Sequence, residues 1–123
     1  MTSSWIGTFR TGAGDRPFPG ILRRSLDTDE ATVVSYQFEA GASFPLHRHA
    51  EEQITFVEEG EIEFRLAGES RRLAAGDWAV TAPEAPHGVV AGPAGARILA
   101  VIIPRRRTGD GYVVVEAASE RSR

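Results

Sequence analysis

Polar and apolar side chains alternate along much of the chain, with the period of two that β-strands show. The alternation is clearest over residues 33–38, where it turns Val34, Tyr36 and Phe38 to one face, and over residues 61–66. No window of a dozen residues keeps its apolar positions at the three-and-four spacing of an amphipathic helix. The pattern therefore predicts an all-β protein.

Turn residues divide the rest of the chain into short segments rich in β-branched and aromatic residues. These segments predict further strands at residues 5–9, 54–57, 78–81, 87–90, 97–103 and 112–115. Predicted turns and loops lie at residues 58–60, 67–70, 76–77 and 92–93. Short strands at such regular spacing are typical of a β-sandwich or barrel. Because no internal repeat is visible, we expect one barrel.

Composition narrows the possible chemistry. The chain has 123 residues, a net charge of −3 and no cysteine, which excludes disulfides, iron–sulfur clusters, thiolate zinc sites and a cysteine nucleophile. An acidic chain argues against binding nucleic acid or an anionic membrane, and the basic run at residues 105–107 is interpreted as a solvated surface segment. The longest apolar run, residues 98–103, is too short to span a bilayer. We expect a cytoplasmic protein whose partner is a small molecule.

The three histidines offer the clearest candidate chemistry. His47 and His49 are separated by one residue near the expected start of a strand, so both imidazoles face the same side. Two ligands on one strand suit a metal ion, although a histidine is also a common surface or core residue. Gln53 follows four residues after His49, and His87 stands after a proline-bearing turn, at the head of a predicted strand.

Two segments carry a resemblance to a known family. Residues 41–60, with Gly41, the HxH pair, Gln53 and Gly60 at fixed intervals, resemble the first motif of the cupin superfamily. Residues 76–87, from Gly-Asp-Trp to Pro-His, resemble the second cupin motif. Two positions depart from the family pattern, because the usual proline falls one position late, at Pro83, and Ala91 replaces an asparagine.

The resemblance implies a single-domain cupin β-barrel of the jelly-roll type that is commonly a homodimer. It also implies one divalent metal ion, Zn, Ni, Mn or Fe(II), held by His47, His49, Gln53 and His87. Glu51 is the alternative to Gln53 as the fourth ligand, although the family register favours Gln53.

The same resemblance defines the expected domain organisation, a single cupin domain over residues 1–123. The barrel covers about residues 20–104. Residues 1–19 form an N-terminal strand and loop arm, and residues 105–123 form a tail. The tail's possible strand at residues 112–115 is expected at a sheet edge or across a dimer.

Gln53 is informative because many cupins have a glutamate at this position. Neutral ligands leave the full dipositive charge on the ion, which favours Lewis-acid chemistry over redox cycling. The HxHxxxQ type resembles pectin-degradation cupins and, more loosely, small cupin cyclases of polyketide pathways. The first group carries an aspartate where this chain has Ala100, and Ile98 and Ile102 make the same wall apolar. We therefore expect an isomerase, cyclase or lyase acting on a small, partly apolar oxygenated substrate.

Two other functions stay open at this point. One is an Fe(II)-dependent dioxygenase in the same barrel. The other is a non-catalytic barrel that binds or senses a small molecule.

A proton donor or acceptor beyond the metal site is harder to assign. Tyr36 faces inward by parity and is the candidate catalytic residue, although packing alone would explain it. Trp78 is expected in the core or in a pocket wall. Arg23 or Arg24 could reach a substrate carboxylate, but a solvated position is the simpler expectation, and Arg48 alternates away from the histidines.

Overall fold

Strands make up all the regular structure of the described residues, 3–106 and 111–116, in this computed structural model. The eight strands are β1 (Ile21–Asp27), β2 (Thr32–Phe38), β3 (Ser43–Arg48), β4 (Glu52–Leu66), β5 (Glu69–Ala74), β6 (Trp78–Thr81), β7 (His87–Ile103) and β8 (Val113–Val114). Within those residues there is no helix, and hence none long and apolar enough to cross a membrane. The prediction of an all-β chain is confirmed.

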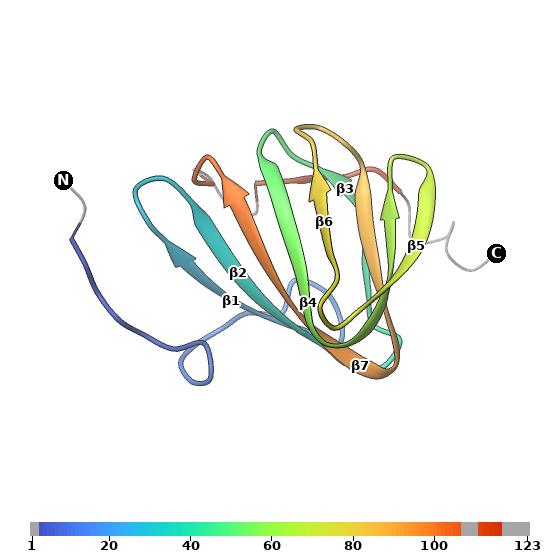
Figure 1. Cartoon of the computed structure of the whole chain (residues 1–123), viewed down its shortest axis with the longest axis horizontal. Helices are drawn as coiled ribbons and strands as arrows, with labels where there is room; N and C mark the ends of the chain where they lie inside the picture. Colours follow the sequence, from blue (N-terminus) through green and yellow to red (C-terminus); the bar gives the residue numbers. More distant parts are fainter. Residues whose placement is uncertain (1–2, 107–110, 117–123) are drawn as a thin grey trace.

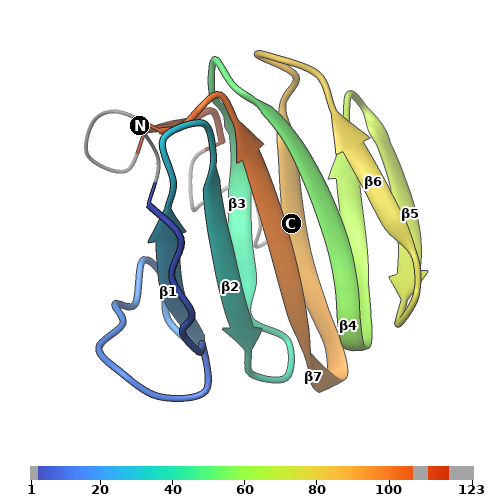
Figure 2. The ribbon, with the colours of Figure 1, turned by 60° about the vertical axis from the view of Figure 1, so that its left-hand side comes forward.

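Two long strands, β4 and β7, connect two layers of antiparallel sheet (Figures 1 and 2). The second half of β7 pairs with β2 and with the first half of β4, which gives one layer in the order β1-β2-β7-β4-β6. The first half of β7 pairs with β3 and with the second half of β4, which gives the order β8-β3-β7-β4-β5. The curled sheet is the cupin barrel that was predicted.

The bends in β4 and β7 lie at glycines. Gly60 and Gly95 have φ values of 73° and 77°, a conformation that side chains rarely adopt. A Cβ on Gly60 would lie 2.2 Å from the Gly95 carbonyl oxygen, so the two bends pack directly on each other. The turns predicted at residues 58–60 and 92–93 are therefore bends and bulges within continuous strands, because each strand regains its partner beyond the glycine.

The core fills the space between the two layers with inward-facing side chains. Val34, Tyr36 and Phe38 lie there, as the alternation predicts. The remaining buried apolar residues come from four strands, β1, β3, β4 and β7: Ile21, Phe44, Val57, Ile62, Phe64, Val89, Ala91, Ile98, Ala100 and Ile102. Ile98, Ala100 and Ile102 thus form the apolar inner wall that was expected of β7.

Several expected elements differ from the structure. Residues 5–9 form no strand, because beyond a single bridge between Asp15 and Arg23 the arm has no strand beside it with which to pair. Strands β1 and β5 were not predicted as strands. The tail strand is confirmed only at residues 113–114, where it pairs with β3 of the same chain. Trp78 is 63% exposed and so outside the core, although it does line a pocket of about 330 Å³ between β4, β5 and β6.

Candidate metal centre

The three histidines meet at one end of the barrel. His47 lies near the end of β3, His49 just beyond it, and His87 begins β7, where it is paired with His47. The HxH pair therefore lies at the end of a strand and not at its start. All three side chains are buried, and their nearest ligand atoms lie within 4.8 Å of one another. These histidines could hold a metal ion.

Each histidine is oriented by a backbone carbonyl two residues away. His47 Nδ1 lies 2.8 Å from the Pro45 oxygen, and His87 Nδ1 lies 3.0 Å from the Ala85 oxygen. His49 Nδ1 lies 3.0 Å from the Glu51 oxygen. In a neutral imidazole with this bond, Nδ1 donates its hydrogen and the lone pair remains on Nε2. This arrangement is common among metal-binding histidines.

Burial keeps two of the imidazoles neutral. It lowers the pKa of His47 to about 3 and that of His87 to about 4, against a usual value of 6.5. The carbonyl beside each ring raises the pKa but does not overcome burial. Both rings are therefore in the form that binds metals at neutral pH.

Gln53 is positioned to complete the ligand set. Its Oε1 atom lies 3.0 Å from His49 Nε2, and its Nε2 donates a hydrogen bond of 2.9 Å to Thr55 Oγ1. With the His49 hydrogen on Nδ1, the two facing atoms both carry lone pairs, so a cation bound to both would relieve their repulsion. The Glu51 carboxylate lies 3.5 Å from His49 Nδ1, on the opposite side of the ring, which argues against the alternative ligand.

The surroundings of His87 independently test whether these residues fit a metal ion. Its Nε2 atom is buried and has no hydrogen-bond partner among the described residues. A buried polar atom without a partner is costly, and a bound ion would remove that cost. Three imidazole nitrogens and one amide oxygen fit a divalent ion, and such ligands accept several first-row metals.

Two arginines and a tyrosine lie deeper in the barrel. Tyr36 is paired with Arg23 across β1 and β2, and its ring packs against Phe44, which separates it from His47. The guanidinium groups of Arg23 and Arg106 hydrogen-bond the Tyr36 side chain. Burial nevertheless raises the pKa of Tyr36 above its usual value of 10.

The two arginines of β1 point to opposite faces of the sheet, Arg23 inward and Arg24 outward. The Arg23 side chain is only 10% exposed and pairs with Asp15, so the expectation of a solvated residue is wrong, because strand parity turns it inward. Arg24 faces outward and donates to the Phe9 and Gly12 carbonyls. Arg48 also faces outward, as predicted, and pairs with Glu84.

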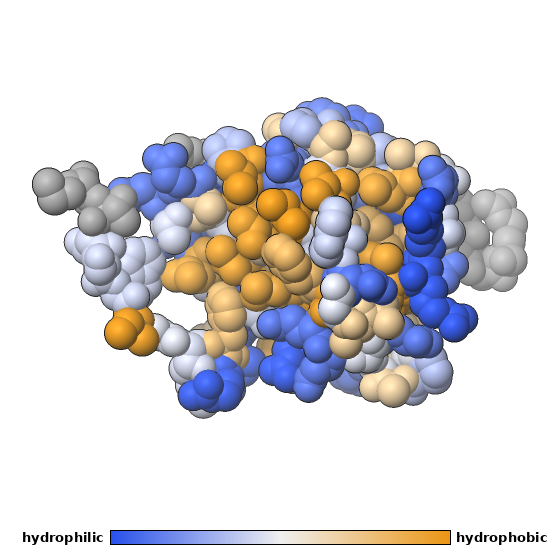
Figure 3. Space-filling view, viewed as in Figure 1, coloured by the Kyte–Doolittle hydropathy of each residue, from blue (hydrophilic) through white to orange (hydrophobic). Residues whose placement is uncertain are grey.

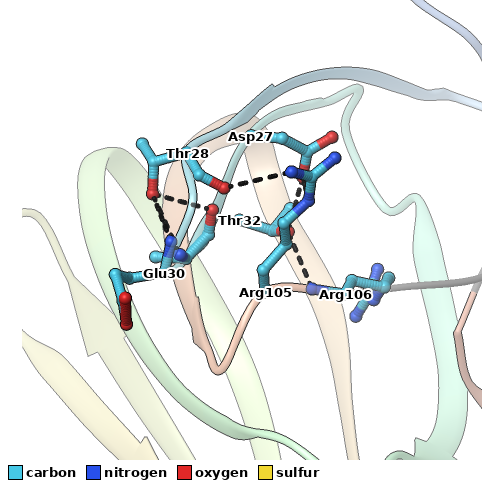
Figure 4. A network of polar contacts seen from close by, with 7 residues as sticks. Asp27, Thr28, Glu30, Thr32, Arg105 and Arg106 are labelled. Carbon is cyan, nitrogen blue, oxygen red and sulfur yellow. Dashed lines mark hydrogen bonds and ion pairs between the residues drawn. The ribbon is translucent and has the colours of Figure 1, made fainter. Parts of the chain in front are cut away.

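Arg106 is held inward by contacts of the chain that follows β7 (Figure 4). Its backbone N–H donates to Thr32 Oγ1 at 2.9 Å, and Thr32 Oγ1 donates to Asp27 Oδ1 at 2.6 Å. Arg105 donates to the Thr28 carbonyl oxygen. The basic run was interpreted as a solvated segment, which is wrong for Arg106. Residue 107 lies outside the described residues.

Tyr112 is, after Arg106, a second residue whose place near the histidines the sequence did not predict. Its ring lies 5.3 Å from that of His47 and 5.4 Å from that of Phe44, between centroids. The segment is fixed by Glu116, which accepts hydrogen bonds from Arg65 and from the Leu46 N–H. The tail thus covers one side of the histidine cluster.

A curled antiparallel barrel with a buried HxH and histidine cluster at its end defines a cupin. The chain belongs to the cupin domain family, whose model matches residues 34–102.

Its relatives include a protein named for pectin degradation. The chain is 32% identical over 89 residues to the pectin degradation protein KdgF of Dickeya dadantii (strain 3937), a match that covers 71% of this chain and 81% of that protein. Among solved structures, KdgF from Halomonas sp. is similar with a TM-score of 0.78 and 30% identity, over 85% of this chain and 96% of that one. An RmlC-like cupin from Shewanella frigidimarina NCIMB 400 has the same TM-score, with 27% identity over 86% and 96% of the two chains. The predicted resemblance to cupins of pectin degradation is confirmed.

Proposed function

We propose that this cupin is a metal-dependent isomerase, cyclase or lyase whose small oxygenated substrate carries a carboxylate. The observation that carries the proposal is the inward guanidinium group of Arg106, whose charge acts on His47 and His87 and which lies, with that of Arg23, close to Tyr36. Similarity to a protein named for pectin degradation supports a sugar-derived acid, since pectin is built from uronic acids.

The two arginines differ in how their charge is balanced. Arg23 forms an ion pair with Asp15, with a hydrogen bond of 2.9 Å from Nε to Oδ1. Among residues 3–106 and 111–116 no ion pair joins Arg106 to a carboxylate, and its buried Nε has no hydrogen-bond partner. Its charge lies close enough to His47 and His87 to lower their pKa values. A substrate carboxylate would suit this guanidinium, which can bind it through two parallel hydrogen bonds.

Tyr36 fits a positioning role in this arrangement. Its hydroxyl oxygen accepts hydrogen bonds from the two guanidinium groups, and its raised pKa keeps the hydroxyl protonated at neutral pH. The ring is fixed by Phe38 and Phe44, whose centroids lie 6.0 and 5.8 Å away. We therefore assign Tyr36 to orienting the arginines, and not to removing a proton from the substrate.

The inward-facing side chains of β7 are apolar and belong to the packed core. Ile98, Ala100 and Ile102 are at most 2% exposed and supply no acid or base. A divalent ion held by His47, His49, Gln53 and His87 would supply Lewis acidity, because its four neutral ligands leave its charge undiminished. The chain's own groups would bind the carboxylate, orient it and exclude water.

Turnover of matched substrates tests the proposal. The protein is loaded with Zn, Ni, Mn or Fe(II) without oxygen and offered unsaturated or keto sugar acids beside their uncharged amides. We expect turnover of the acids only. Replacing Arg106 by methionine should lower kcat/KM about 100-fold, because it removes a charge-assisted bidentate contact. The matched variant Arg105→Met alters a neighbour that contacts Thr28 and Asp27 instead, and should retain activity.

Other outcomes would contradict the proposal. Equal turnover of acid and amide would exclude the carboxylate contact. Oxygen uptake that requires both iron and substrate would indicate the dioxygenase alternative. Tight binding of an acid without any turnover would indicate the non-catalytic alternative.

A further inference from the structure

The Arg106 side chain points inward although it does not belong to a strand. Strand β7 ends at Ile103, and residues 98–104 carry no charged group. Both faces of β7 are apolar there: its inner residues belong to the core, and Figure 3 shows apolar residues gathered across the middle of the outer face, over β2, β7 and β4. Because the period of a strand does not extend to residue 106, contacts with other parts of the chain must hold this side chain in place.

Gly111 makes one of these contacts. Its φ of 72° is a conformation that side chains rarely adopt. The three atoms nearest to a Cβ placed on Gly111 all belong to Arg106, with Cδ at 2.5 Å, Cγ at 2.6 Å and Nε at 2.7 Å. Real Cβ atoms almost never come closer than 3.0 Å to another atom of this kind. The stem of Arg106 therefore lies against the Gly111 backbone, in space that only a glycine leaves open.

The segment that follows Gly111 is fixed to the strand that carries His47. Strand β8 pairs with β3 at His47, and the Tyr112 ring lies 5.3 Å from the His47 ring, between centroids. Glu116 accepts a hydrogen bond of 2.9 Å from the backbone of β3. The same strand therefore sets the position of the first histidine of the cluster and, through Gly111, that of Arg106.

We propose that Gly111 is a positioning residue, which holds the Arg106 guanidinium in the direction that binds the substrate carboxylate beside the histidine cluster. This role rests on the proposed function, in which Arg106 makes that contact. In its present direction the charge of Arg106 acts on His47 and His87. A bidentate contact depends on the direction of the planar guanidinium as well as on its charge. Contact with Gly111 restricts that direction.

Nuclear magnetic resonance of the zinc-loaded protein tests the contact without a substrate. The Arg106 Nε atom is buried, so its N–H should exchange slowly with water, and the signal missing from the Arg106→Met spectrum identifies it. Gly111→Ala introduces a Cβ whose nearest neighbours belong to a flexible side chain. We therefore expect the Arg106 stem to move, and its Nε–H signal to shift and to exchange faster.

Gly41→Ala is the matched control, because Gly41 also has a φ of 72°, while a Cβ there would meet nothing within 4 Å. This variant introduces the same backbone strain without the contact, so it should leave the Arg106 signal unchanged. The Nε atom of Arg97 is also buried, and its signal should stay the same in both variants as an internal reference.

Calorimetric titration with galacturonate, a uronic acid, measures the consequence for binding. Gly111→Ala should weaken binding about 10-fold, since the guanidinium keeps its charge but loses its direction, and Gly41→Ala should bind as the wild type does. In the Arg106→Met background, Gly111→Ala should have no further effect, because the residue through which it acts is absent. A role of Gly111 in folding alone would instead weaken binding equally in both backgrounds.

Two results would overturn the positioning role and leave the proposed function standing. One is an unchanged Arg106 signal in Gly111→Ala, and the other is an equal loss of galacturonate binding in both backgrounds. Equal or absent binding by the wild type and Arg106→Met would instead contradict the proposed function, and with it the carboxylate contact inferred for Arg106. The Arg106 signal distinguishes the two failures, because it does not depend on a ligand.

Discussion

Replacing Thr55 by valine isolates the orientation of the Gln53 amide. Thr55 is fully buried on β4, and its Oγ1 accepts the hydrogen bond from Gln53 Nε2. That bond determines which end of the amide faces His49, so that the oxygen and not the nitrogen approaches the histidine cluster. Valine has a similar shape and lacks the acceptor, so the amide loses the contact that distinguishes its two orientations.

The expected effect follows from one neutral buried hydrogen bond, which contributes about 1 kcal/mol. A Gln53 amide that can rotate would present its NH₂ group to a cation part of the time. Groups that orient metal ligands typically change metal affinity by about 10- to 100-fold. We expect the effect of Thr55→Val to lie at the lower end of this range. Its Kd for the metal should be about 10-fold higher, equivalent to about 1.4 kcal/mol.

A chelator-competition titration measures this change, and Thr81→Val is its matched control. Thr81 is also fully buried and is paired with Gln53 across β4 and β6, but its Oγ1 has no hydrogen-bond partner among the described residues. Thr81→Val should therefore keep the wild-type metal affinity. If Thr55→Val binds metal as tightly as the wild type does, the assignment of Gln53 as an oriented ligand is refuted.

Three further predictions concern stability. Glu116→Gln weakens the ion pair with Arg65 and should lower the free energy of unfolding in urea by about 1 kcal/mol, whereas Glu69→Gln, at an exposed pair, should leave it unchanged. The hydrogen bond from Arg23 lowers the pKa of Asp15 below 3.8, so anchoring of the arm should persist above that pH. Anchoring should be lost as pH falls through the lowered value, seen as faster proteolysis of the arm by an acid-active protease. Removing metal with a chelator should lower the thermal midpoint, since an ion at 1,000 times its Kd stabilises the fold by about 4 kcal/mol.

The alternation of side chains along the chain was sufficient to predict the direction of those residues that lie in regular strands. Alternation placed Tyr36 inside because its neighbours on β2 repeat every second residue, and the same period put His47 and His49 on one side. The bends at Gly60 and Gly95 resemble turns locally, and only the partner strands beyond them show that β4 and β7 continue. That information lies in long-range pairing, which no short window contains.

The polar half of the candidate site was harder to predict for a different reason. Arg23 follows strand parity, but a charged residue in the interior is rare, so the pattern favours a solvated position. Arg106 and Tyr112 lie in irregular chain after β7, where no period relates position to direction. Their places depend on contacts such as the bond to Thr32, which only the folded chain brings together.

X-ray absorption at the edge of the bound metal tests the central claim most directly. The protein is loaded with one equivalent of zinc or nickel, and the scattering of the imidazole rings gives the number of histidine ligands. We predict three imidazole nitrogens and at least one oxygen donor, with one imidazole lost in His87→Ala. Fewer than three imidazoles in the wild type, or an unchanged spectrum in His87→Ala, would contradict the metal centre described above.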